Sequence, residues 1–585
     1  MTNQTIPRKE YPRPQFERKH WLNLNGQWQF AFDRQNIGEK EQWYRSESFD
    51  QQIIVPFTYE TEASGIGEEA FCPNIWYQRH VTIPQEQVGK KVILRFQAAD
   101  YVTKVWVNGE FVGSHKGGQI AFSFDITRHI NEKEEFNLVI KCEDSFSCFQ
   151  PRGKQRWVEE NFACWYVQTT GIWQTVWLEF LHETHLETVK ITPNIDRESV
   201  KFVYQLAENS FDDELVLKTK ITFENTEIAE YSFQMNRATH TAEIDLTSEA
   251  FHWRIMHWNP HTPNLYDVEF TLLQGDKIID CVQSYFGMRK ISIEDGNVLL
   301  NNVPIYQKLL LDQGYWKDSH LTPPSEAAII EDIEKTFEMG FNGVRKHMKV
   351  EDQRYLYWAD KKGLLVWSEM AATFEFSDEA VQNFTEEWTE VVQQQYNHPS
   401  IITWTPFNES WGIKNIYTDC QQQQFTEAIY HLTKSIDRMR PVIVNDGWEH
   451  TISDIITLHD YEEYGKRFFD RYADKDKILK DIAFNEGKYA FAKGYEYKGQ
   501  PIIISEYGGI AFTDEEGWGY GNQVKNEEGF FERFEAITQA IKDTPYVSGY
   551  CYTQITDVQQ EVNGLLTETR EPKVDLKRIK EILDK

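Results

Sequence analysis

The chain has 585 residues and carries 61 basic against 92 acidic side chains, a formal net charge of −31 at pH 7. Domains usually contain about 50 to 250 residues, so this length predicts roughly three domains, each with a sizeable core. The negative charge repels phosphate backbones and anionic lipid surfaces, which excludes nucleic acid and membranes as expected partners.

We expect no signal peptide at the start of the chain. Its first twenty residues are polar and include three prolines, so they lack the apolar run of a signal peptide. No later stretch approaches the length of a membrane span. Seven scattered cysteines, without the C-x-x-C spacing of zinc or redox sites, are typical of free thiols in a reducing compartment. We therefore expect a soluble, cytoplasmic protein.

Residues 1–180 predict an N-terminal jelly-roll β-sandwich. From Trp21 onward, short alternating runs are separated by turn residues, as where the run 102–107 leads through Asn108-Gly109 into the run 110–112. An Asn-Gly pair between alternating runs is a strong hairpin signal. A sandwich of the jelly-roll type fits this length.

Residues 181–288 predict a second domain, an immunoglobulin-like β-sandwich. The stretch is rich in strand patterns, for example over residues 188–191, 215–217 and 266–270. Its size of about 100 residues suits that fold.

Residues 289–585 predict a C-terminal (β/α)8 TIM barrel. Apolar runs alternate here with amphipathic helical stretches such as 325–339 and 526–543, and this alternation is typical of parallel β/α units. The eight apolar runs cover residues 305–311, 343–347, 364–370, 401–408, 442–445, 455–459, 501–505 and 547–553. Eight strands in a length of about 250 residues or more indicate a closed barrel.

Two of the eight runs end in a glutamate, Glu409 on the fourth and Glu506 on the seventh. Catalytic groups of such barrels lie at the carboxyl ends of the strands, and strands four and seven lie on opposing arcs, so the two carboxyls can converge across a bound sugar. A single glutamate at a strand end is more often a cap or an ion-pair partner. A pair about 5–5.5 Å apart is what a retaining glycosidase requires.

Four motifs carry a resemblance to a known family. They are Asn408-Glu409-Ser-Trp, Ser505-Glu506-Tyr-Gly-Gly, Gly171-Ile-Trp-Gln-Thr-Val-Trp177 and Phe286-Gly-Met-Arg289. In these motifs, and in the order of its three predicted domains, nearly the whole chain resembles the family 2 glycoside hydrolases (β-galactosidases and β-glucuronidases). The resemblance implies a retaining, exo-acting hydrolase of β-glycosides.

The resemblance also implies roles for individual residues. Glu409 would be the general acid/base, Glu506 the nucleophile, and Asn408 would direct its amide at the sugar 2-hydroxyl. Glu409 must then hold a proton near neutral pH, which the aromatic residues Trp404, Phe407 and Trp411 can assist by desolvation. Tyr461 and Tyr507 are the candidate hydrogen-bond donors to Glu506.

Further polar and aromatic residues complete the predicted rim of the barrel. Arg345 and His347 alternate on the second strand, so they share one face, where contact with the sugar and internal pairing are about equally expected. With Asn408, the expected substrate-binding residues are Arg345, His347, His459, Tyr461, Trp448, Gln554 and Trp165. Trp165 stands close to the place where better-known relatives send an acidic residue toward the sugar.

The substrate is not decided by the sequence. β-Glucuronidases of the family usually carry Asn-x-Lys after the eighth strand, whereas this chain reads Val562-Asn-Gly-Leu565 there. The large β-galactosidases bind magnesium through Glu and His ligands near the acid/base. Of these ligands only one Glu has a counterpart in this chain, Glu369. We therefore expect no metal or other cofactor. β-Galactosides are the leading substrates, while β-glucuronides, β-mannosides, glucosaminides and arabinosides stay open.

Two other classes of protein fit this sequence less well. A carbohydrate-binding homologue that has lost catalysis would not need both Glu409 and Glu506. A structural or adhesive sandwich protein would need an export signal and would have no use for carboxylates at a barrel mouth. The expected partner is thus a carbohydrate substrate, and a homo-oligomer is left open.

Overall fold

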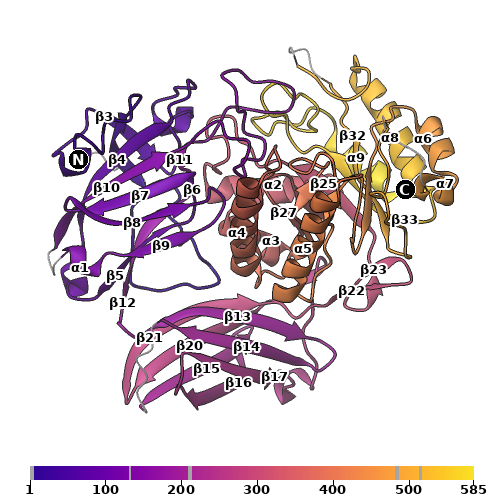
Figure 1. Ribbon diagram of the computed structural model, residues 1–585. Helices are drawn as coiled ribbons and strands as arrows, with labels where there is room; N and C mark the ends of the chain where they lie inside the picture. The colour runs from indigo at the N-terminus through magenta and orange to yellow at the C-terminus, as the bar shows by residue number, and fades with distance from the viewer. Residues whose placement is uncertain (1–5, 131–133, 208–213, 481–486, 513–516) are drawn as a thin grey trace.

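The computed structural model describes residues 6–130, 134–207, 214–480, 487–512 and 517–585. Figure 1 shows three bodies in chain order: one sandwich beside a barrel and a second sandwich below both. The expected fold class, jelly roll, immunoglobulin-like sandwich and TIM barrel, is confirmed. Among the described residues, no helix is both long and apolar enough to cross a bilayer. All seven cysteines are free, and Cys420 is exposed.

The first sandwich consists of a six-stranded and a four-stranded antiparallel sheet. The larger sheet has the order β3 (Gln51–Val55), β2 (Gly26–Phe32), β4 (Asn74–Thr82), β10 (Glu135–Glu143), β7 (Val102–Val107) and β8 (Glu110–Lys116). The smaller has the order β1 (Trp21–Asn23), β12 (Val176–Leu181), β5 (Lys91–Phe96) and β9 (Phe122–Asp125). The short strands β6 (Ala99–Asp100) and β11 (Gly171–Ile172) pair beside them, and the short helix α1 (Thr127–Ile130) precedes β10.

The predicted hairpin lies between β7 and β8. Asn108 and Gly109 both have positive φ, 51° and 79°, as a two-residue turn between twisted strands requires. Val107 and Glu110 face each other across the turn.

The second sandwich consists of a three-stranded and a four-stranded sheet. Its strands are β13 (Leu186–Asn194), β14 (Ser199–Leu206) and β17 (Thr239–Asp245) against β16 (Thr226–Gln234), β15 (Leu215–Phe223), β20 (Tyr266–Gln274) and β21 (Lys277–Phe286). The small pairs and ribbons that follow are β18 (Trp258–Asn259), β19 (Thr262–Pro263), β22 (Ile291–Glu294), β23 (Asn297–Leu300) and β24 (Val303–Pro304). This domain reaches the barrel through the helical layer, where the Trp258 indole and the Tyr285 hydroxyl donate hydrogen bonds to Asp360.

The barrel strands follow the predicted apolar runs. They are β25 (Gln307–Asp312), β26 (Gly343–Lys346), β27 (Leu365–Glu369), β28 (Ile401–Thr405) continued by β29 (Phe407–Asn408), β30 (Asn445–Asp446), β31 (Ile456–His459), β32 (Ile502–Gly508) and β33 (Val547–Thr553). Seven are hydrogen-bonded in the order β28-β27-β26-β25-β33-β32-β31, and β29 pairs with β30. The His459 amide donates to Gly447 O (3.3 Å) between β30 and β31.

Helices cover the outside of the barrel. They are α2 (Glu326–Glu338), α3 (Gln353–Lys362), α4 (Asp378–Gln395), α5 (Cys420–Ile436), α6 (Gly465–Tyr472), α7 (Lys475–Leu479), α8 (Glu527–Lys542) and α9 (Leu576–Asp584). Several begin at a polar cap: Ser325, Ser377 and Asn526 accept from the backbone of the first turn of α2, α4 and α8. Such caps satisfy amides that have no partner inside the helix.

Strand alternation explains why polar residues gather at one end of the barrel. Leu309, Leu311, Leu365 and Trp367 belong to the apolar cluster that fills the interior, whereas Leu310 packs outward among the helices. The inward positions that follow at the carboxyl ends are polar, as on β27, where Glu369 comes two residues after Trp367. The barrel interior is thus apolar in its middle and charged at the carboxyl ends of its strands, the end called the mouth below.

A loop of the first sandwich, residues 145–170, reaches this mouth. The amides of Arg152 and Gly153 both donate to Ala372 O, after β27, at 3.0 and 3.2 Å. Gly153 has φ 60°, and a Cβ there would lie 2.2 Å from Met348 O, so only glycine permits this close approach. One wall of the barrel mouth therefore comes from another domain.

Candidate active site

Glu409 directly follows β29, in a strained piece of backbone. Glu409 and Ser410 have φ values of 50° and 61°, in the left-handed region that side chains rarely adopt. Strand β30 holds this turn, because the Glu409 amide donates to Asp446 O (2.9 Å) and the Ser410 amide donates to Asn445 Oδ1 (2.9 Å). The Glu409 carboxyl is thereby presented at the mouth with its side chain 23% exposed.

Glu506 lies within β32 and is almost fully buried. Arg345 Nη1 donates to its Oε1 at 2.8 Å, and the Tyr461 hydroxyl donates to its Oε2 at 2.5 Å. Tyr507, the other expected donor, instead shares a hydrogen bond with Thr538 on α8 (3.0 Å). The side chain after Glu506 thus points into the helical layer.

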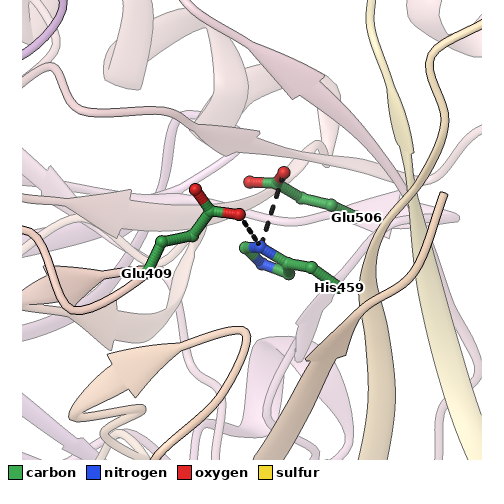
Figure 2. Close-up of side chains that lie close together, drawn as sticks. All are labelled: Glu409, His459 and Glu506. Carbon is green, nitrogen blue, oxygen red and sulfur yellow. Dashed lines mark hydrogen bonds and ion pairs between the residues drawn. The ribbon is translucent and has the colours of Figure 1, made fainter. Parts of the chain in front are cut away.

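The two glutamates converge around His459 (Figure 2). One carboxylate oxygen of each and one ring nitrogen of His459 all lie within 4.8 Å of one another. This set is the one group of three in the described part of the chain whose donor atoms are close enough to hold a metal ion. Such a separation of two carboxylates is also the geometry of a retaining glycosidase.

Arg345 connects the carboxylates below the two glutamates. Its guanidinium is fully buried and lies 2.7 Å from both Glu369 and Asp446, in addition to its bond with Glu506. Burial opposes its charge, but these carboxylates raise its pKa well above the usual value. Its remaining N–H groups reach Asn408 Oδ1 (2.7 Å) and the backbone, so Arg345 holds protein groups and has no donor left for a sugar.

Asn408 and His347 each keep one polar atom without a protein partner among the described residues. Asn408 accepts from Arg345 through Oδ1, which leaves the two N–H groups of its amide for a ligand. His347 Nδ1 lies 3.0 Å from Arg345 Nη2. Burial and the nearby cations Lys154 and Arg345 hold the pKa of His347 well below its usual range, so its ring is neutral. When Nδ1 accepts from Arg345, Nε2 carries the proton and can donate.

Three other residues expected to contact the sugar are His459, Gln554 and Trp448, and they differ in their protein partners. Both ring nitrogens of His459 face carboxylates, since Nδ1 is 2.8 Å from Glu409 and Nε2 is 2.9 Å from Asp446. Gln554 is fully buried and bonded to Gln313 and Asn563. Trp448 packs edge-on against His459 at 5.5 Å, and its indole N–H has no partner among the described residues. The indole N–H of Trp448 is thus, within the described part of the chain, an unpaired donor beside His459.

The protonation of Glu409 differs from the sequence expectation. Burial alone raises its pKa, but the hydrogen bond and charge of His459 outweigh burial and lower it below the ordinary value. Two of the aromatic residues expected to desolvate it face outward, as Trp404 donates to Asp437 and Phe407 stacks on Phe384. Burial therefore acts on the pKa of Glu409 in the expected direction, but the charge and hydrogen bond of His459 outweigh it.

The proton is instead held by His459. Burial opposes a charged ring, but the carboxylates of Glu506 and Asp446, with the hydrogen bonds to Asp446 and Glu409, raise the pKa of His459 to about 10. A protonated imidazole repels cations and cannot ligate them. Without a metal ion, the group of Glu409, His459 and Glu506 therefore holds a proton on His459.

Aromatic residues of the first sandwich form the wall beside Glu409. Trp165 is nearly buried and packs edge-on against Trp411 (5.1 Å) and Phe374 (5.6 Å) of the barrel. Trp157 and Phe162, from the same loop, complete this cluster. The indole N–H of Trp165 has no partner among the described residues. Trp165 thus belongs to the aromatic wall that includes Trp411, two residues after Glu409.

Lys154 was missed by the sequence reasoning. Its ammonium lies 5.8 Å from the Trp165 ring, and within the described residues no carboxylate forms an ion pair with it. Burial opposes its charge, but the Cys164 thiol and the carboxylates of Glu561 and Glu506 raise its pKa above the usual value. The one sequence signal was the Gly153-Lys154 pair in a loop of an acidic chain. Lys154 supplies a cation at the mouth from outside the barrel.

The sequence matches three related family descriptions in succession. Residues 21–179 match "Glycosyl hydrolases family 2, sugar binding domain", residues 184–289 "Glycosyl hydrolases family 2", and residues 291–585 "Glycosyl hydrolases family 2, TIM barrel domain".

Curated relatives carry two different names. A β-galactosidase of Thermoanaerobacter pseudethanolicus is 25% identical over 461 residues, which are 75% of this chain and 57% of that relative. A β-glucuronidase of Rattus norvegicus is 23% identical over 535 residues, 84% and 78% of the two chains. The chain spans about half the length of the bacterial relatives it matches. The β-glucuronidase structure from Ruminococcus gnavus shares the fold, with a TM-score of 0.80, 18% identity and 99% of each chain covered.

Proposed function

The chain belongs to glycoside hydrolase family 2, and on that premise we propose that it is a retaining, exo-acting β-glycosidase with Glu506 as nucleophile and Glu409 as acid/base. The observation that carries the proposal is that one carboxylate oxygen of Glu409 and one of Glu506 lie within 4.8 Å of each other. Retaining enzymes need about 5–5.5 Å, whereas inverting enzymes need about 6.5–9.5 Å to admit a water between the groups.

In the first step, a Glu506 oxygen attacks the anomeric carbon and Glu409 protonates the departing glycosidic oxygen. Arg345 and Tyr461 aim the Glu506 carboxylate by holding one oxygen each. The positive charge that develops on the sugar is stabilised by the carboxylates around it. In the second step, Glu409 takes a proton from water, and this water displaces Glu506 from the covalent glycosyl-enzyme.

The substrate contacts divide between two domains. The free amide N–H groups of Asn408 and the Nε2–H of His347 can hold sugar hydroxyls from the barrel side. Trp165 and Trp411 form an apolar wall near Glu409 that a sugar or its leaving group can contact. Arg345, His459 and Gln554 act through other protein groups in this proposal.

β-Galactosides remain the leading substrates, in accord with the β-galactosidases among the relatives. A β-glucuronide is the second candidate, because Lys154 offers an ammonium without an ion-pair partner among the described residues. An ammonium in this position can pair with a sugar carboxylate although the usual Asn-x-Lys lysine is absent. If so, Lys154→Met should lower kcat/KM for the glucuronide about 10- to 100-fold, the value of a charged hydrogen bond, and leave the galactoside within a few-fold.

We propose no metal requirement. Glu369, the one counterpart of a magnesium ligand, is fully buried, and its oxygens are engaged by Arg345 (2.7 Å) and the Met348 amide (2.9 Å). Activity should therefore survive dialysis against EDTA unchanged.

The test is hydrolysis of nitrophenyl β-galactoside, β-glucuronide, β-mannoside, β-glucoside, N-acetylhexosaminide and arabinoside by the wild-type protein. We expect one sugar to be released with retained anomeric configuration, followed by proton NMR, and a 2-fluoro analogue of that sugar to label Glu506 covalently. A silent panel with tight glycan binding would favour the carbohydrate-binding alternative. An inverted product or a label on another residue would overturn the assignment.

A further inference from the structure

His459 lies between the two glutamates, and its ring is fully buried. Figure 2 shows its Nδ1 facing both carboxyls, 2.8 Å from Glu409 Oε1 and 3.5 Å from Glu506 Oε2. On the far side of the ring, Nε2 lies 2.9 Å from Asp446 Oδ2. A neutral imidazole has one N–H, so it cannot donate to carboxylates on both sides. The ring is either an imidazolium or shares a proton with a carboxyl group.

Asp446 is not the carboxyl that shares this proton. Its Oδ2 also lies 2.7 Å from the buried guanidinium of Arg345. Burial opposes its ionisation, but Arg345 and His459 together hold the pKa of Asp446 well below its usual range. The Nε2–H bond to Asp446 is therefore fixed, and the mobile proton lies on the other side, between Nδ1 and Glu409 Oε1.

We propose that His459 stores the proton that Glu409 delivers to the leaving group. His459 is then a positioning residue for the acid/base, in place of the sugar contact expected from the sequence. This inference rests on the function proposed above.

The proton and electron balance of the first step is complete within these residues. An electron pair of Glu506 forms the bond to the anomeric carbon, and the pair of the breaking C–O bond stays on the leaving oxygen. That oxygen takes a proton from Glu409, which takes the Nδ1 proton of His459. The step ends with a glycosyl ester on Glu506, an ionised Glu409 and a neutral His459.

The second step reverses these transfers. Water attacks the anomeric carbon and gives a proton to Glu409, which returns it to His459 Nδ1. The bond to Glu506 breaks, and its electron pair restores the carboxylate. The enzyme regains one imidazolium and two carboxylates, so no other reactant is needed.

The charge of Glu506 links the proton on His459 to the formation of the glycosyl ester. While Glu506 is ionised, its charge 3.5 Å away favours the imidazolium. Esterification removes that charge, so the proton leaves His459 more easily at the moment the leaving group requires it. Hydrolysis restores the charge and draws the proton back.

Other ionisable groups face His459 from several elements. They are Glu409 after β29, Asp446 on β30, Glu506 on β32, His347 after β26 and His450 after β30. The pKa of His347 and of His450 is lowered, mainly by burial, so both rings are neutral. The three carboxylates therefore decide the charge of His459.

The test compares His459→Gln with wild type on a series of leaving groups attached to the sugar found active. Glutamine can donate to Asp446 but cannot take up a proton. We expect kcat/KM for the unactivated alkyl and phenyl glycosides to fall by about 10²–10⁴-fold, the usual contribution of acid catalysis, while the 2,4-dinitrophenyl glycoside stays within about 10-fold of wild type. The basic limb of the pH profile should also move to lower pH.

The outcomes are distinct. An equal loss for all leaving groups with an unchanged pH profile would mean a structural role and overturn the proposal, as would wild-type behaviour on every substrate. Activity on the dinitrophenyl glycoside also shows that the variant folds. Failure of the proposed function appears elsewhere, as a silent wild-type panel.

A measurement on the wild type serves if the variant does not fold. In 15N-histidine NMR spectra at pH 8, we expect one buried imidazolium in the free enzyme, and its titration should move to lower pH in the 2-fluoroglycosyl-enzyme. If the His459 ring is neutral at pH 8, or titrates at the same pH in both forms, proton storage on His459 is refuted.

Discussion

The ends of the fourth and seventh barrel strands carry the same residue type in different surroundings. The Glu506 side chain is 5% exposed and is fixed by Arg345 on β26 and Tyr461 in the loop after β31. The Glu409 side chain is 23% exposed, lies on a strained turn, and its carboxyl pairs with His459. The strand end supplies the carboxyl, whereas neighbours from other strands decide whether it is held as an anion or linked to a proton.

Of the two glutamates, Glu506 should give the larger loss of activity when it is replaced. Glu506→Gln keeps the size of the side chain but removes the nucleophile, so kcat should fall by about 10⁶-fold, as when the nucleophile of a covalent mechanism is lost. Turnover of the nitrophenyl glycoside measures this, and an unchanged melting temperature is the control. Activity within 100-fold of wild type would rule out Glu506 as nucleophile.

Glu409→Gln removes the proposed acid/base. The resulting loss of activity should depend on the leaving group. We expect a loss of about 10²–10⁴-fold for glycosides that need acid assistance and little loss of the first step for a dinitrophenyl glycoside. Added azide should restore turnover and give a β-glycosyl azide, because it needs no general base. The same test on Glu506→Gln provides the contrast, since azide there should yield no β-azide.

Tyr461→Phe sharpens the comparison by removing one of the two groups that hold Glu506. A hydrogen bond to a charged group contributes about 1.5–3 kcal/mol, so kcat/KM should fall about 10- to 100-fold for every leaving group alike. Stopped-flow and steady-state kinetics over the leaving-group series check this. A loss confined to poor leaving groups would place Tyr461 with the acid/base instead.

Lys154→Met should have the smallest effect on a neutral substrate. The charge of Lys154 is among the causes that lower the pKa of Glu409, so its removal should strengthen proton binding by the Glu409–His459 pair. The basic limb of the kcat/KM profile for the galactoside should therefore move to higher pH, by less than about one unit for a single charge at the mouth. A shift to lower pH would contradict the assigned position of this ammonium.

The sequence by itself determined the fold class and the two glutamates. Strand and helix periods are local, so the runs around Leu309 and Ile503 predicted barrel strands without knowledge of their partners. A glutamate directly after an apolar run lies at the carboxyl end of its strand whatever the rest of the chain does. These predictions depend only on residues close in sequence.

Only the tertiary structure decided the directions and partners of the side chains. The pairing register shifts beside His459 and between Ile504 and Tyr507, so counting alternate positions fails where the strands end. Tyr507, a candidate donor to Glu506, instead faces α8.

The charges at the mouth were likewise beyond the sequence. Lys154 lies more than 250 positions before Glu409 in the chain and reaches it through a loop of another domain. The proton on His459 depends on three carboxylates from three strands, because a pKa is set by every charge nearby in space, whatever the distance along the chain.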